Sequence, residues 1–201
     1  KGVVVQHQLP VDRLAGRTTA GREAITLTAA QETALASIRQ HQDAEPGRPL
    51  LLRGVTGAGK THLYIERIRE TLAAGRQALY LLPEIGLTKQ IIERVQAAFG
   101  ERVGVYHSRF SAAERVEIWH KVLRGEYAVV IGVRSALLLP FEELGLIVVD
   151  EEHDASFKQS QSQPHYNARD LALWYGRRFG VPVLLGSATP AVETSANAKH
   201  G

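Results

Sequence analysis

Short apolar runs alternate with longer segments of helical period along most of the chain. The runs at 129–131 and 147–149 are apolar on consecutive positions, which is typical of strands that are buried on both faces. Because strands and helices alternate with short connections, the pattern predicts an α/β fold. We expect a doubly wound, mainly parallel sheet with helices on both faces, and a ligand site at the carboxyl ends of its strands.

The pattern also defines the expected elements. Strands are predicted at 50–53, 78–82, 102–106, 127–132, 146–149 and 181–185. Helices are predicted at 28–42, 61–74, 88–99, 111–124 and 167–179. Thr28 and Ser111 are residues that favour an N-cap, and Glu114 stands at the capping-box distance from Ser111.

Two segments lack this pattern. Residues 1–24 hold a short apolar patch followed by Gly, Arg and Thr, and we expect them to be a linker or the tail of a preceding domain. Residues 25–201 are expected to form one domain. The segment 154–166 is polar, has no period and contains three aromatic or imidazole rings. Loops of this length in compact domains are usually functional or disordered.

The composition is that of a globular protein, with 44% hydrophobic and 22% charged residues in 201. The net charge of +3 is too small by itself to indicate a nucleic-acid partner. No apolar run is long enough to span a bilayer and no signal-peptide pattern is visible, so we expect a cytoplasmic protein without a membrane partner. Cysteine is absent, which excludes a disulfide framework, and methionine is absent even at position 1, so we expect the chain to begin inside a longer polypeptide.

Residues 54–61 match the phosphate-loop pattern G-x-x-x-x-G-K-[ST], between a predicted strand and a predicted helix. The glycines let backbone N–H groups turn toward phosphate oxygens, and the helix N-terminus adds its positive end. Lys60 is expected to contact the β- and γ-phosphates, and Thr61 to bind Mg²⁺. The predicted nucleotide-binding residues of this loop are Gly54, Val55, Thr56, Gly57, Ala58, Gly59, Lys60 and Thr61.

A second motif follows the strand predicted at 146–149, which ends in Asp-Glu-Glu-His. Its position lets Asp150 hold the Mg²⁺ that Thr61 also contacts. Glu151 can orient and deprotonate the attacking water. The alternative is that these acidic residues are ordinary solvated charges of a loop. The phosphate loop upstream makes that alternative less favoured. We therefore predict a nucleotide hydrolase with Glu151 and Lys60 as catalytic residues, and at this point a kinase, a GTPase and a motor remain open.

The remaining motifs resemble those of a known protein family. Residues 150–153 resemble the DExH box of superfamily 2 helicases, and Gly-Ser-Ala-Thr-Pro at 186–190 resembles their Ser-Ala-Thr motif. More specifically, the chain resembles the PriA family of bacterial primosomal replication-restart helicases. The stretches that carry this resemblance are 54–61, 82–88, 107–108, 131–141, 150–153, 168–172 and 186–190. The resemblance implies that 25–201 is the ATP-binding lobe, the first of two RecA-like lobes.

The resemblance implies an ATP- and Mg²⁺-dependent 3′-to-5′ DNA helicase that couples hydrolysis to translocation on single-stranded DNA in replication restart and primosome assembly. Implied partners are single-stranded and forked DNA, primosome proteins and single-strand DNA-binding protein. Zinc is expected elsewhere in the full-length family and not within this chain, which has no Cys. The charge-stabilising arginines of the family come from the second lobe, so this chain alone is expected to be nearly inactive.

Individual roles also follow from the resemblance. Gln31 corresponds to a glutamine that contacts adenine, although with Thr28 it also has capping-box spacing. The residues expected to couple the nucleotide site to motion are His153, Ser187 and Thr189, and the alternative for His153 is a polar wall residue.

The residues expected to contact DNA fall in two groups. Phosphate contacts are implied for Thr88, Lys89, Arg134 and Ser135. The loop that senses DNA in this family corresponds to Phe157, Lys158, His165 and Tyr166, whose rings can stack on unpaired bases. The alternatives are an ordinary solvated loop for the first group and rings packed on the domain surface for the second.

Two other functions remain open from the sequence. The first is a nucleotide-gated docking module for DNA and protein whose hydrolysis is dispensable. The second is another superfamily 2 translocase, against which the segments 131–141 and 154–166 argue.

Overall fold

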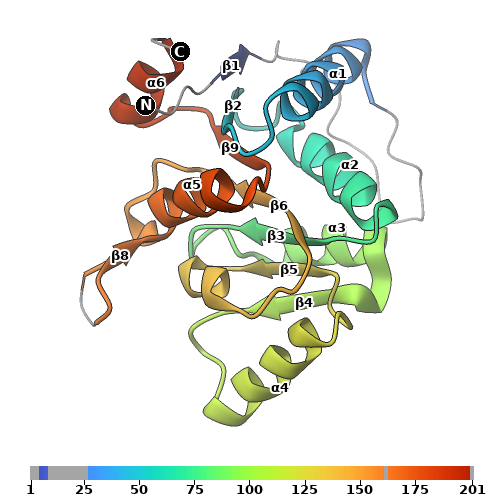
Figure 1. Cartoon of the computed structure of the whole chain (residues 1–201), viewed down its shortest axis with the longest axis vertical. Coiled ribbons are helices and arrows are strands. Elements are labelled where there is room, and N and C mark those ends of the chain that lie inside the picture. Colours follow the sequence, from blue (N-terminus) through green and yellow to red (C-terminus); the bar gives the residue numbers. More distant parts are fainter. Residues whose placement is uncertain (1–4, 9–26, 161–162, 200–201) are drawn as a thin grey trace.

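The computed structural model describes residues 5–8, 27–160 and 163–199. Its centre is a seven-stranded sheet with the strand order β1-β2-β9-β6-β3-β5-β4, and every neighbouring pair is parallel (Figure 1). The strands are β1 (Val5–Gln8), β2 (Leu50–Arg53), β3 (Gln77–Leu81), β4 (Val103–Tyr106), β5 (Val129–Gly132), β6 (Leu144–Val149) and β9 (Val183–Ser187).

The helices between these strands lie close to their predicted bounds. They are α1 (Ala29–Ala44), α2 (Lys60–Ala73), α3 (Lys89–Phe99), α4 (Ala112–Leu123) and α5 (Ala168–Phe179), and a further helix, α6 (Val192–Lys199), follows β9. Three short 3₁₀ turns are η1 (Gly100–Arg102), η2 (Arg134–Leu138) and η3 (Ala155–Phe157). The capping boxes at Thr28 and Ser111 are both present, which explains why these helix starts could be predicted from the sequence.

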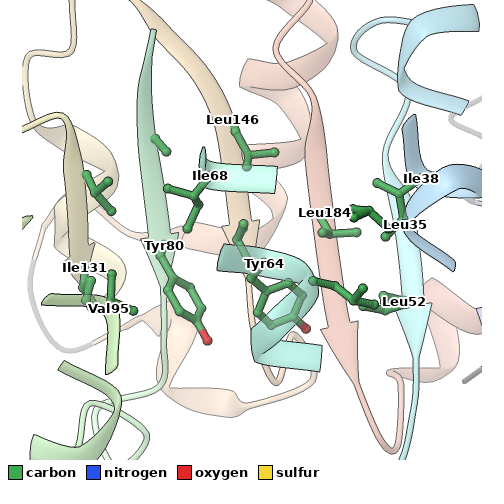
Figure 2. Packing of buried hydrophobic residues seen from close by; sticks show 14 of the residues in the cluster. Leu35, Ile38, Leu52, Tyr64, Ile68, Tyr80, Val95, Ile131, Leu146 and Leu184 are labelled. Atoms are coloured by element: carbon green, nitrogen blue, oxygen red, sulfur yellow. The ribbon is translucent and has the colours of Figure 1, made fainter. Parts of the chain in front are cut away.

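The core has two halves, one on each face of the sheet. α1, α2 and α3 contribute Ile38, Ile68 and Val95 to the first face (Figure 2). On the other face Val122 of α4 and Ala172 of α5 belong to a second cluster, and α1 and α2 lie on the opposite side of the sheet from α5 (Figure 1). Successive strand residues alternate between the two clusters, so strands buried on both faces read as continuous apolar runs. The predicted doubly wound parallel sheet is confirmed.

Three features differ from the expected organisation. β1, from the segment expected to be a linker or tail, pairs with β2 at the sheet edge. The segment 154–166 is not wholly irregular, because η3 is followed by a two-stranded antiparallel pair, β7 (Lys158–Gln159) and β8 (Tyr166–Asn167). α6 was not expected, since its polar sequence has almost no amphipathic period. The rest of residues 1–24 lies outside the described residues, and the domain boundary stays a prediction.

In the part of the chain that the structure describes, no helix is both long enough and apolar enough to cross a membrane.

Candidate active site

The phosphate loop joins β2 to α2 and has the backbone shape that an anion site needs. Gly57 and Gly59 adopt φ angles of +83° and +81°, which L side chains rarely allow. Gly59 is also the N-cap of α2 and provides no side-chain cap. The helices α1, α3, α4 and α5 instead begin with side-chain caps from Thr28, Thr88, Ser111 and Asn167. The first N–H groups of α2 are therefore left for a ligand rather than for a side chain.

Lys60 lies inside this loop. Its side chain is largely buried, and its Nζ donates to the carbonyl oxygens of Gly54 at 2.7 Å and of Val55 at 3.4 Å. These bonds hold the ammonium group in the loop, where its charge is available to phosphate oxygens.

Asp150 follows β6 at the same edge of the sheet. Burial raises the pKa of its carboxyl, the neighbouring Glu151 charge raises it further, and the positive charge of Lys60 opposes both effects. The Lys60 ammonium group and the Asp150 carboxylate therefore interact electrostatically, and their binding of one nucleotide stays a prediction. A bound cation would offset both of the causes that raise the pKa.

The predicted Mg²⁺ ligands, Thr61 and Asp150, suit this ion only together with a nucleotide. Among the described residues, no group of three or more His, Cys, Asp or Glu side chains is placed to hold a metal. Mg²⁺ is commonly bound through one or two protein ligands, with phosphate oxygens and water completing its shell. One carboxylate and one hydroxyl beside a phosphate loop fit that pattern.

Glu151 has an unusual backbone. Its φ angle of +47° is the only positive value of a non-glycine residue among those described. Such a conformation costs roughly 1–3 kcal/mol and is found mainly where function requires it. The side chain is partly exposed, and its Oε2 lies 3.8 Å from Nδ1 of His153. The predicted general base is therefore beside Asp150 and open to solvent, as a residue that activates water must be.

The three residues predicted to couple the site to motion are in contact. His153 Nδ1 lies 2.8 Å from Ser187 Oγ, and its Nε2 lies 3.4 Å from Thr189 Oγ1. The Thr189 N–H also donates to Ser187 Oγ at 3.0 Å. The turn after β9 is thereby linked to the turn after β6, beside Glu151, and the coupling role itself stays a prediction.

The side-chain amide of Gln31 makes two hydrogen bonds. Its Oε1 accepts from the Thr28 N–H at 2.9 Å, which completes the capping box, and its Nε2 donates to the Ala58 carbonyl at 3.4 Å. The capping alternative is therefore present, and the side chain also contacts the phosphate loop. Adenine contact remains a prediction, and it would require the amide to exchange one of these partners.

The contact between Gln31 and the loop predicts a difference between two glycines. A Cβ at Gly57 would meet nothing within 4 Å, whereas one at Gly59 would lie 2.1 Å from Gln31 Nε2. Gly57→Ala is expected to cost about 1–2 kcal/mol of stability because of its positive φ. Gly59→Ala is expected to cost more, since Gln31 must also leave its capping box.

Chemical denaturation measures this difference in the two variants, in Gln31→Ala, and in Gly59→Ala combined with Gln31→Ala. Measured against Gln31→Ala, the cost of Gly59→Ala should fall to that of Gly57→Ala. Equal losses in the two single variants would show that the Gln31 contact does not constrain the loop.

The predicted phosphate contacts to DNA lie after β3 and β5. Thr88 is the N-cap of α3, and Lys89 is exposed with an ion pair to Glu93 at 3.4 Å. Arg134 and Ser135 are partly exposed in η2. Arg134 Nη1 donates to the Ser156 carbonyl at 2.8 Å, which ties η2 to the loop that follows the acidic motif.

The loop predicted to sense DNA requires one correction. Phe157 is only 1% exposed and belongs to the same core cluster as Ala168 and Ala172, so its ring is not offered to a base. The η3 turn folds this residue inward, and an apolar ring gains more from core packing than from water. Lys158 and His165 are exposed and Tyr166 is half-buried, so these three remain as predicted contacts.

Sequence reasoning missed several residues of this site. Tyr64 and Tyr80 hydrogen-bond to Asp150, and Glu152 is a fully buried carboxylate that binds Arg169. The sequence pattern places Tyr64 in a predicted helix and Tyr80 in a predicted strand, and it assigns Glu152 no role beyond membership of the Asp-Glu-Glu-His motif. The apolar positions beside both tyrosines indicate burial, but no sequence signal indicates where their hydroxyls point.

Comparison with known proteins identifies the family of this chain. The family model for DEAD/DEAH box helicases matches residues 28–198. The chain belongs to the DEAD/DEAH box helicase family. Within this family it is 43% identical over 179 residues to the replication restart protein PriA of Bacillus subtilis (strain 168). That match covers 89% of this chain and 22% of that protein, so the chain spans about a fifth of the relative's length. The predicted resemblance to PriA is confirmed.

Two solved structures share the fold of this chain. A structure of RecG bound to a three-way DNA junction aligns with a TM-score of 0.63 at 27% identity, over 88% of this chain and 23% of that one. The helicase domain of Hef from Pyrococcus furiosus aligns with a TM-score of 0.57 at 20% identity, over 85% of this chain and 35% of that one. The RecA-like fold predicted from the resemblance is thus confirmed for this DEAD/DEAH box helicase chain.

Proposed function

We propose that this chain is the ATP-binding lobe of a DNA-dependent ATPase, a DNA helicase that acts in replication restart and primosome assembly. The placement of Lys60 and Asp150 at one edge of the sheet carries the proposal, because it brings a phosphate loop and an acidic strand end to one nucleotide. The similarity to the replication restart protein PriA supports the cellular role. The 3′-to-5′ direction belongs to the same proposal, as do single-stranded and forked DNA, primosome proteins and single-strand DNA-binding protein as partners.

In this proposal the chain binds and orients the nucleotide. The N–H groups of the phosphate loop and the Lys60 ammonium hold the β- and γ-phosphates. Thr61 and Asp150 hold Mg²⁺, which neutralises developing charge on the transferred phosphoryl group. Glu151 accepts the proton of the attacking water.

One loop connects a proposed DNA contact to the proposed catalytic base. Arg134, a proposed phosphate contact, is bonded to the Ser156 carbonyl. Ser156 lies five residues after Glu151 in the same loop. A backbone contact with DNA at Arg134 or at the exposed Lys158 can therefore displace the segment that carries the proposed base, which supports stimulation of hydrolysis by DNA.

The chain by itself is proposed to be a poor ATPase. The arginines that stabilise transition-state charge in this family come from a second lobe, and an arginine finger contributes about 10³–10⁵ in rate. Nucleotide binding by this lobe alone is correspondingly proposed to be weak.

The test is ATP hydrolysis by the full-length protein in Mg²⁺ or EDTA, with and without single-stranded DNA. We expect hydrolysis that requires Mg²⁺ and rises when DNA is added. No hydrolysis under any condition would refute the ATPase. Hydrolysis that ignores DNA would refute the coupling, and DNA binding without hydrolysis would favour the docking module instead.

A further inference from the structure

Two tyrosines lie directly beneath the acidic strand end. Tyr64 comes from α2 and Tyr80 from β3, and both are 0% exposed. Their ring centroids are 5.6 Å apart in an edge-to-face arrangement. Figure 2 shows both hydroxyls pointing toward the same end of the sheet, where the strand arrows end. The rings thus belong to the core, while the hydroxyls belong to the candidate active site.

Each hydroxyl binds a different oxygen of Asp150. Tyr64 Oη donates to Oδ1 and Tyr80 Oη donates to Oδ2, both at 3.1 Å. The N–H of Glu151 adds a bond to Oδ1 at 3.1 Å. Because the two oxygens are held from different elements, the carboxylate cannot rotate about its last bond without losing a buried hydrogen bond. The carboxylate is therefore held in one orientation before any ligand arrives.

Tyr64 is fixed by its surroundings. A Cβ at Gly186 would lie 1.7 Å from Tyr64 Oη and 2.9 Å from Asp150 Oδ1. The hydroxyl therefore occupies the space that a side chain on β9 would need. This glycine is the first residue of the segment that contains Ser187 and Thr189. The hydroxyl of Tyr64, which belongs to α2, therefore packs against that segment.

We propose that Tyr64 and Tyr80 are positioning residues for the Mg²⁺ of the nucleotide. Their hydroxyls together hold the Asp150 carboxylate, a predicted ligand of that ion, in one orientation. This inference rests on the proposed function, because it concerns the metal of the proposed ATP site.

The test is made with Tyr64→Phe and Tyr80→Phe in the full-length protein. Phenylalanine keeps each ring in the core and removes only the hydroxyl. Tyr175→Phe is the matched control, since that ring packs against Phe179 on α5 and makes no described hydrogen bond to the site. The affinity for a fluorescent ATP analogue is measured by titration in EDTA and in Mg²⁺, and the Mg²⁺ concentration that gives half of the binding change is recorded.

In EDTA both variants should bind the analogue within about twofold of wild type. The Mg²⁺ concentration needed for half of the change should rise about 10-fold or more, which is the usual cost of losing a group that orients a metal ligand. The rise should be larger for Tyr80→Phe, because Oδ2 then loses its described hydrogen bond, whereas in Tyr64→Phe Oδ1 keeps the bond from the Glu151 N–H. Tyr175→Phe should match wild type under both conditions.

The outcomes separate this inference from the proposed function. If wild type binds the analogue better with Mg²⁺ and both variants match it, the positioning role is wrong and the proposed site stands. If the variants lose affinity equally in EDTA and in Mg²⁺, the tyrosines only shape the core and the positioning role is again wrong. If wild type shows no effect of Mg²⁺, the proposed function fails and this role fails with it.

Discussion

Replacing Glu151 with glutamine is expected to lower DNA-stimulated ATP hydrolysis by the full-length protein about 10²–10⁴-fold, the usual contribution of a general base. Glutamine has the same size but cannot accept the proton of the attacking water. Glu151 lies beside Asp150, partly exposed and held at a positive φ of +47°, so its carboxylate faces solvent at the strand end. Binding of ATP should stay near the wild-type level, since the phosphate loop is untouched.

Single-turnover hydrolysis and nucleotide titration measure the two effects separately. Glu142→Gln is the matched control, because Glu142 is exposed and precedes β6, at the opposite end of the strand that Glu151 follows. The control should hydrolyse ATP normally. Turnover near the wild-type rate in Glu151→Gln would show that Glu151 is not the general base. Loss of ATP binding would show that its role is structural.

The largest loss of stability is expected for Glu152→Ala. The Glu152 side chain is 0% exposed and accepts from Arg169 Nη1 at 3.1 Å, the Ala191 N–H at 2.7 Å and Thr194 Oγ1 at 2.8 Å. Removing it leaves the mostly buried Arg169 guanidinium without this partner and frees the start of α6. Breaking a buried charge pair from one side costs about 3–5 kcal/mol.

The control for this prediction shares the same arginine. Asp170 also pairs with Arg169, at 2.8 Å, but its side chain is 58% exposed. Asp170→Ala should therefore cost at most about 1 kcal/mol, as exposed ion pairs do. Glu152→Gln, which keeps one of the two acceptor oxygens and loses the charge, should fall between the two in thermal unfolding. Equal losses for Glu152→Ala and Asp170→Ala would contradict the buried role of Glu152.

Much of the fold follows from local patterns in the sequence. Runs such as 129–131 and 147–149 indicate strands covered on both faces, and N-caps such as Thr28 and Ser111 mark helix starts. These signals are local because they depend on backbone hydrogen bonding and on side chains a few residues apart. The edge strand β1 and the helix α6 carry no such signal. The position of β1 depends on its pairing with β2, and the start of α6 depends on a hydrogen bond to Glu152.

The sequence by itself determined the chemical parts of the candidate site. A phosphate loop and an acidic strand end are each recognisable from a few adjacent residues, and parallel strands bring their carboxyl ends to one edge. Residue type also identified Lys60, Asp150 and Glu151 as the groups suited to that chemistry.

Only the tertiary structure decided what surrounds those parts. The tyrosine hydroxyls meet Asp150 because α2 and β3 pack side by side, and Phe157 turns into the core although its neighbours along the chain are polar. Such outcomes depend on contacts between segments that are far apart in sequence. The free energy of those contacts comes from packing and from buried hydrogen bonds, which no local period of the chain encodes.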